Sequence, residues 1–181
     1  SGTRGPLDAV EVPSHLMEEF ARDPRVLASF ARGLPPGLAE EALAVHSSLA
    51  AVEMQSQVLF SAADQTAFGP GAEELIVSGD ADVATFERLE AAVALDQCAL
   101  TSLPLDPDTG APLIQLASHG HLTNYGGAYY AYPFARMYAA QIYEKHFATE
   151  PMSPEGGRAV WQGMLQYGAS RDASSMLRDV G

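Results

Sequence analysis

The sequence contains one cysteine, few basic residues and no long apolar run, and each shortage excludes a class of protein. Because Cys98 is the only cysteine among 181 residues, no disulfide can form within the chain. Lysine and arginine together number 10 against 23 acidic residues, which gives a formal net charge of −13. This charge argues against nucleic acid and anionic membrane surfaces as partners, because both require basic patches. No apolar run is long enough to span a bilayer.

The chain is long enough for one ordinary domain with a hydrophobic core, and 47% of its residues are hydrophobic. It begins with Ser1 rather than Met and ends on Val180-Gly181, soon after a helical pattern begins. We therefore expect this chain to be part of a longer protein. The sequence contains no internal repeat and no low-complexity tract.

Apolar residues recur mainly at helical spacing, so the predicted fold class is mostly α. Pro13 interrupts the first helical pattern, and a further break is expected at Asp23-Pro24. Two short apolar runs, at 75–77 and 113–117, are candidate strands. After the pattern around Leu16, the expected helices cover residues 25–32, 38–67, 82–100, 132–147 and 154–167, with a short helix after Asp172.

The segment HLTNYGGAYYAY, from His121 to Tyr132, places one imidazole and four phenols around a glycine pair. Both side-chain types donate directed hydrogen bonds without a fixed charge. Gly126 and Gly127 allow positive φ angles and a close approach to a ligand, and Pro133 favours a helix start near Tyr132. We interpret the residues from His121 to Ala131 as a mobile loop that closes over a substrate and stabilises developing negative charge. The alternative is that these tyrosines are ordinary core and rim residues bonded to backbone groups.

No complete active-site motif is present in the chain. His119 and His121 would point to the same side of an extended segment and could share a metal, although such pairs are common by chance. The sequence has no His-Glu-x-x-His helix, no glycine-rich phosphate loop and no nucleophile elbow. Considered alone, Glu11 is interpreted as a first-turn helix carboxylate favoured by the helix dipole.

Two segments resemble parts of the thimet oligopeptidase and mitochondrial intermediate peptidase family. Residues 2–18, GTRGPLDAVEVPSHLME, resemble one family segment, and the residues from His121 to Tyr132 resemble a second. Both are most similar to the mitochondrial intermediate peptidase branch. Asp64-Gln65 and the stretch 168–173 are weaker similarities, so the resemblance extends over nearly the whole chain.

The resemblance implies zinc endopeptidases that cut short, extended peptides in a deep channel of a largely helical catalytic domain. In that family a His-Glu-x-x-His helix supplies two zinc ligands and the general base, and the next helix supplies a glutamate as third ligand. The resemblance implies that Glu11 is a metal ligand, and that Glu18 supports this ligand from behind or lies on the helix surface. It implies that His121, Tyr125 and Tyr132 are catalytic donors. It also implies that Tyr129, Gly126 and Gly127 bind the substrate.

We therefore expect residues 1–181 to be the C-terminal portion of a zincin-type oligopeptidase catalytic domain, truncated at both ends and lacking the His-Glu-x-x-His helix. The full-length protein is predicted to hold one Zn²⁺ and to cleave oligopeptides or precursor peptides by attack of a metal-activated water. Its partners would be peptide substrates and the missing N-terminal part. The isolated chain is predicted to be inactive, and the expected compartment is the mitochondrial matrix, with the cytoplasm or a plastid as alternatives.

Two alternatives belong to other classes of protein. One is a non-catalytic helical peptide-binding or interaction domain that lacks the metal site. The other is a structural helical module whose tyrosine segment packs internally.

Overall fold

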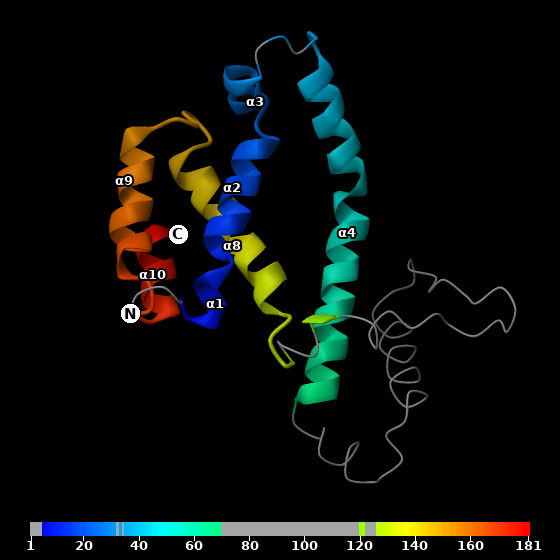
Figure 1. The fold of residues 1–181 in the computed structure, drawn as a ribbon, viewed down its shortest axis with the longest axis vertical. Helices are drawn as coiled ribbons and strands as arrows, with labels where there is room; N and C mark the ends of the chain where they lie inside the picture. Colours follow the sequence, from blue (N-terminus) through cyan, green and yellow to red (C-terminus); the bar gives the residue numbers. More distant parts are fainter. Residues whose placement is uncertain (1–4, 32, 34, 70–119, 122–125) are drawn as a thin grey trace, which may run out of the picture. The chain divides into compact units, whose positions relative to one another are not determined.

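The computed structural model describes residues 5–31, 33, 35–69, 120–121 and 126–181, and these residues are mostly helical (Figure 1). The predicted mostly α class is confirmed, and the described residues contain no strand. The candidate strands at 75–77 and 113–117, and the expected helix over 82–100, lie outside the described residues. The helices are α1 (Leu7–Val10), α2 (Val12–Arg22), α3 (Pro24–Phe30), α4 (Leu38–Phe68), α8 (Ala131–His146), α9 (Pro154–Gly163), the 3₁₀ helix η1 (Leu165–Tyr167) and α10 (Ala173–Val180).

The chain divides into two compact units. The first unit comprises Ser1–Leu49 together with Ala131–Gly181, and the second comprises Ala50–Tyr130. Helix α4 therefore contributes residues to both units. Within the described residues, no helix is sufficiently long and apolar to cross a membrane.

Proline positions set the breaks between the first three helices, as the sequence predicts. Glu11 separates α1 from α2, and Pro13 lies in the first turn of α2, where its missing N–H is tolerated. Asp23 ends α2 and caps α3 by accepting a hydrogen bond from the Arg25 backbone N–H at 2.8 Å, directly before Pro24. The two breaks thus leave one acidic residue each, Glu11 and Asp23, outside regular helix.

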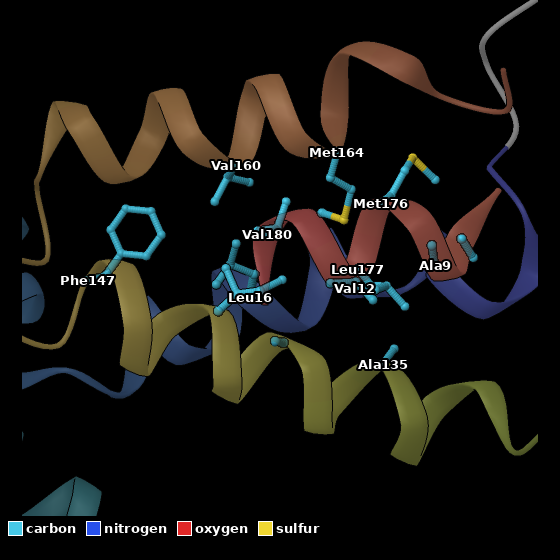
Figure 2. Packing of buried hydrophobic residues seen from close by; sticks show 13 residues of the cluster. Ala9, Val12, Leu16, Ala135, Phe147, Val160, Met164, Met176, Leu177 and Val180 are labelled. Carbon is cyan, nitrogen blue, oxygen red and sulfur yellow. The ribbon is translucent and has the colours of Figure 1, made fainter. Parts of the chain in front are cut away.

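The core of the first unit lies among α1, α2, α8, α9 and α10. Helix α2 packs along α8, where Ala135, Ala139 and Ile142 recur on one buried face. The small alanine side chains let the two helices approach closely. Leu16 of α2, Val160 of α9 and Val180 of α10 lie in the same core (Figure 2).

A polar cluster around the buried Asp23 joins the α2–α3 turn to the end of α8. The Tyr143 hydroxyl donates to Asp23 Oδ2 at 2.7 Å, and Arg25 Nη2 donates to the same oxygen at 2.6 Å. Arg25 also donates to the backbone oxygens of Ala148 at 2.7 Å and Thr149 at 3.1 Å. The Arg25 hydrogen bond holds the pKa of Asp23 well below its usual range, against the effect of burial.

The C-terminal helices depart from the prediction at one point. The predicted helix from Pro154 through Tyr167 ends at Gly163, and a 3₁₀ turn follows after Met164, whose φ is −135° and ψ is −62°. Glycine is a poor helix former, and the break lets the Met164 side chain enter the core. The predicted cap of the last helix is confirmed, because Asp172 accepts a hydrogen bond from the Ser175 N–H at 2.9 Å.

Candidate active site

The predicted site residues fall into two described groups, one in each compact unit. Tyr125 lies outside the described residues. The first unit holds Glu11, Glu18 and Tyr132. The second unit holds His121, Gly126, Gly127 and Tyr129.

Glu11 is a half-buried residue at the junction between α1 and α2. With a φ of −93° and a ψ of −5°, it is the C-cap of α1 and the N-cap of α2. Ser14, one turn later, contacts both acceptors of Glu11: its hydroxyl lies 2.9 Å from the carboxylate Oε2 and 2.8 Å from the backbone oxygen. The hydroxyl contact orients the carboxylate, which can supply one oxygen ligand to a metal.

Glu18 lies on the surface of α2, and its side chain is 49% exposed. His15 Nδ1 and Arg22 Nη2 each lie 3.2 Å from Glu18 Oε2, at spacings of three and four residues along the helix. A surface ion pair such as Arg22–Glu18 stabilises a helix by only about 0.3–0.5 kcal/mol. The structure therefore gives Glu18 one ion pair and one histidine contact on the helix that begins beside Glu11.

Tyr132 occupies the first turn of α8, which begins at Ala131. The predicted helix start near Tyr132 is confirmed, and Pro133 lies in the first turn, where proline is well tolerated. The Tyr132 side chain is half-buried. Its place at a helix start fixes the backbone from which the phenol projects.

A turn formed by residues 126–129, which we name the Gly-Gly turn, is bonded to the last turns of α4. The Asp64 carboxylate is fully buried, at 0% exposure. Its Oδ1 accepts a hydrogen bond from the Gly127 N–H at 2.8 Å, and its Oδ2 accepts one from the Tyr129 N–H at 2.9 Å. Gln65 Nε2 donates to the Gly127 carbonyl oxygen at 2.8 Å. These bonds fix both polar groups of the Gly127 backbone.

The two glycines of the turn are required for different reasons. Gly127 has a φ of +78°, a conformation that residues with a side chain rarely adopt. Gly126 lies against Phe68, and a Cβ there would come within 2.9 Å of the Phe68 ring. Gly127 is therefore required for its backbone conformation, and Gly126 is required because a side chain there would collide with Phe68.

Tyr129 is buried at 6% exposure within the second unit. Its ring centroid lies 5.6 Å from that of Phe60 and 6.2 Å from that of His121. Burial raises the pKa of the Tyr129 phenol, and a hydrogen bond with the Gln57 side chain opposes that rise. The structure thus brings two predicted site residues, His121 and Tyr129, into edge contact.

The expected loop from His121 to Ala131 is only partly irregular. His121 itself has helical backbone, and the described residues 126–130 form turns. Sequence patterns missed the role of Asp64, which they gave only as a weak family similarity. One sequence signal was available: Asp64 shares a helix face with Phe60 and Phe68. An acidic residue on an apolar face is expected to be buried, and it then needs hydrogen-bond donors.

A metal site cannot be assembled from the residues that the structure describes: no group of three or more His, Cys, Asp or Glu side chains lies together there. Glu11 is compatible with one ligand position, because its carboxylate is half-buried and already oriented by Ser14. Other ligands would have to come from outside the described residues.

The sequence over its full length, 1–181, matches the model of peptidase family M3, and the chain belongs to that family. Mitochondrial intermediate peptidases are among its similar relatives. The protein of that name from Malassezia globosa is 33% identical over 98% of this chain and 21% of its own length. The one from Eremothecium gossypii is 33% identical over 99% and 22%, and the one from Rattus norvegicus is 30% identical over 99% and 24%.

This chain therefore spans less than a quarter of the length of these relatives, between 21% and 24%. No solved structure matches it.

Proposed function

We propose that the complete protein is a zinc-dependent metalloendopeptidase that cleaves oligopeptides or precursor peptides, and that this chain is the C-terminal portion of its catalytic domain. The observation that carries the proposal is the match to peptidase family M3 over residues 1–181. The oriented carboxylate of Glu11 and the ordered Gly-Gly turn support it.

In this proposal Glu11 supplies one of the protein ligands of the metal, and the other ligands lie outside this chain. Zinc, when bound, makes a water molecule nucleophilic near neutral pH and polarises the scissile carbonyl. Ser14 keeps the Glu11 carboxylate oriented through its 2.9 Å contact. Glu18, on the surface of α2, stabilises the helix that begins beside this ligand.

The donors of the proposed site act on the peptide. His121, Tyr125 and Tyr132 donate hydrogen bonds to the peptide backbone and to the oxyanion that develops during attack, which neutral donors stabilise well in a water-poor site. Gly126, Gly127 and Tyr129 shape the segment that contacts the substrate. Since phenols donate only while protonated, activity should be lost at alkaline pH.

Zinc content and peptide hydrolysis of the full-length protein test the proposal. We expect about one zinc per chain and hydrolysis of an internally quenched peptide that a chelator abolishes. Glu11→Gln should lower both zinc content and hydrolysis, whereas Glu155→Gln, an exposed first-turn glutamate of α9, should leave both unchanged. A full-length protein that binds peptides without zinc and without hydrolysis would instead be a peptide-binding domain.

Phenylalanine substitutions separate catalysis from packing. Tyr125→Phe and Tyr132→Phe each remove one donor and retain the ring, so the proposal predicts a kcat loss of about 100-fold with little change in Tm. A changed Tm with normal kcat would indicate a structural module. The isolated chain is proposed to be inactive, and hydrolysis by this chain alone, free of other peptidases, contradicts that.

The compartment that we propose is the mitochondrial matrix, because the relatives described above are named mitochondrial intermediate peptidase. Protease protection of the native protein in fractionated mitochondria tests this assignment. Recovery in the cytoplasmic or plastid fraction would contradict it.

A further inference from the structure

One face of α4 carries four side chains that contact the Gly-Gly turn. Successive members lie three or four residues apart, so they lie on one side of the helix. These residues are Gln57, Phe60, Asp64 and Phe68. The aromatic members contact Tyr129 and Gly126, and the polar members bond to Tyr129 and to the turn backbone.

Asp64 is the central member of this face. Its two carboxylate oxygens each accept one backbone N–H, from residues two apart in the turn, at 2.8 and 2.9 Å. Hydrogen bonds to an ionised acceptor are about twice as strong as neutral ones, and they strengthen in a buried environment. An amide in place of the carboxylate would have one acceptor oxygen only, and its NH₂ group would face a backbone N–H.

Gln65 acts on the same peptide unit from the next position of the helix. Its side-chain amide donates to the Gly127 carbonyl oxygen at 2.8 Å. Asp64 and Gln65 together thus hold the Gly127 backbone by its N–H and by its C=O. That residue has a φ of +78°, so these bonds hold it in a conformation that defines the direction of the turn.

Burying a carboxylate costs free energy unless its donors compensate. At Asp64 the donors are the backbone N–H groups of Gly127 and Tyr129, so the stability of the buried carboxylate depends on the Gly-Gly turn. Within the same unit, the Tyr129 ring lies in edge contact with His121, at 6.2 Å between ring centroids. Fixing the turn therefore limits the positions that Tyr129 can reach beside His121.

We propose that Asp64, assisted by Gln65, is a positioning residue of the peptidase: it fixes the Gly-Gly turn and, through Tyr129, the surroundings of His121 in the same unit. This inference rests on the proposed function. Asp64 itself does not touch substrate in this proposal, so it acts on the transition state through the loop geometry.

The kinetic test uses Asp64→Asn in the zinc-loaded, full-length protein. A misplacement of about 1 Å can lower the rate by about 100-fold, so we expect kcat to fall by about 10- to 100-fold. Zinc content should remain close to that of the unmodified protein, because the Gly-Gly turn supplies no metal ligand in the proposed function. The ratio kcat/KM should fall at least as far as kcat, because the turn also contacts the substrate in that proposal.

The matched control is Asp23→Asn, which changes a buried carboxylate at the α2–α3 turn in the other compact unit. It should lower Tm and leave kcat unchanged. An equal kcat loss in both variants would overturn the proposal, because general destabilisation would then explain the effect.

Hydrogen–deuterium exchange over residues 126–131 supplies a measurement that needs no activity. Asp64→Asn should speed exchange of the Gly127 and Tyr129 amides, and Asp23→Asn should not. Unchanged exchange in Asp64→Asn would overturn the positioning role. If the unmodified protein lacks zinc-dependent hydrolysis, the proposed function fails, and exchange still decides whether Asp64 fixes the turn.

Gln65→Ala keeps the proposal testable if Asp64→Asn does not fold. Gln65 is exposed, so its truncation leaves no cavity, and it removes only the bond to the Gly127 carbonyl. We expect faster exchange over residues 126–131 and a kcat loss of about severalfold, smaller than that of Asp64→Asn. Normal exchange together with normal kcat in Gln65→Ala would overturn its part in the proposal.

Discussion

Replacing Tyr143 by Phe removes one hydroxyl from the polar cluster that joins the α2–α3 turn to α8. That hydroxyl donates to Asp23 Oδ2 at 2.7 Å, and Asp23 is only 8% exposed. The ring itself is retained, including its edge contact with Phe20 at 5.1 Å between centroids. The substitution therefore tests a single hydrogen bond to a buried charge.

The magnitude follows from what Asp23 retains. A hydrogen bond to a charged group contributes about 1.5–3 kcal/mol to the free energy of unfolding. Arg25 still donates to both carboxylate oxygens, at 3.0 Å from Nε to Oδ1 and 2.6 Å from Nη2 to Oδ2. Because the carboxylate keeps these partners, we expect Tyr143→Phe to cost about 1–2 kcal/mol.

Urea unfolding of the full-length protein and its variants, followed by far-UV circular dichroism, measures this cost. In the Asp23→Asn background the charged acceptor is gone, so Tyr143→Phe should cost clearly less than in the unmodified protein. An equal cost in both backgrounds would refute the reasoning, because the hydroxyl would then contribute independently of the Asp23 charge.

The loss of stability caused by Tyr143→Phe should depend on pH, and the direction of this dependence can be worked out. The pKa of Asp23 is lowered from its usual 3.8, so its contribution is present above about pH 4 and is lost as pH falls through the lowered value. Burial, with the Asp23 hydrogen bond, raises the pKa of Tyr143 to about 12. The Tyr143 contribution is therefore present below about pH 10 and is lost as pH rises toward the raised value.

The stability difference between the unmodified protein and Tyr143→Phe should thus be largest between about pH 5 and pH 9. It should shrink in acid, where Asp23 becomes protonated, and in alkali, where an ionised Tyr143 would face the Asp23 carboxylate. A stability difference that is as large in acid and in alkali as it is near neutral pH would contradict the hydrogen bond.

Three further substitutions test other parts of the structure by thermal or urea unfolding. Gly127→Ala forces a side chain onto a φ of +78° and should cost about 1–2 kcal/mol, whereas Gly157→Ala, in open space on α9, should be neutral or stabilising. Equal effects of Gly127→Ala and Gly157→Ala would contradict the argument that the positive φ of Gly127 requires glycine. Asp172→Ala loses the cap on the Ser175 N–H and should cost about 1 kcal/mol, with Asp172→Asn much milder. Ala139→Leu overfills the fully buried α2–α8 contact and should cost about 1–3 kcal/mol, so an unchanged Tm would mean that the helices separate easily.

Helix starts were predictable from the sequence because their causes are local. Proline follows Asp23 and Ser153 directly, and both side chains accept a hydrogen bond from a backbone N–H in the first turn of the next helix. Asp172 does the same for α10. These signals involve residues within one turn of each other, so they do not depend on the rest of the fold.

The end of α9 was not predictable in the same way. The helical pattern continues past Gly163, but the structure breaks the helix there and buries Met164 at 4% exposure. A Cβ on Gly163 would come within 2.4 Å of Val180 Cγ2, so this glycine allows close packing with α10. That contact joins residues distant in sequence, which periodicity does not report.

The candidate site shows the same limit. The residue types from His121 to Tyr132 indicate hydrogen-bond donors, but the roles of Glu11, Tyr125 and Tyr132 came from family resemblance and remain predictions. The hydrogen bonds of Asp64 depend on a turn 63 and 65 residues later. No local pattern around Asp64 could have identified its partners.

The same long separation has a consequence for the order of folding. Helix α4 is built from contacts within each turn, so it can form early, on a microsecond timescale. The bonds from Asp64 to Gly127 and Tyr129 close a loop of 63 to 65 residues, and the entropy of that closure must be offset before they form. We expect the Gly-Gly turn to become ordered only late in folding, so an incompletely folded molecule would have α4 but no ordered Gly-Gly turn. Any property that depends on this turn would then be acquired among the last folding events.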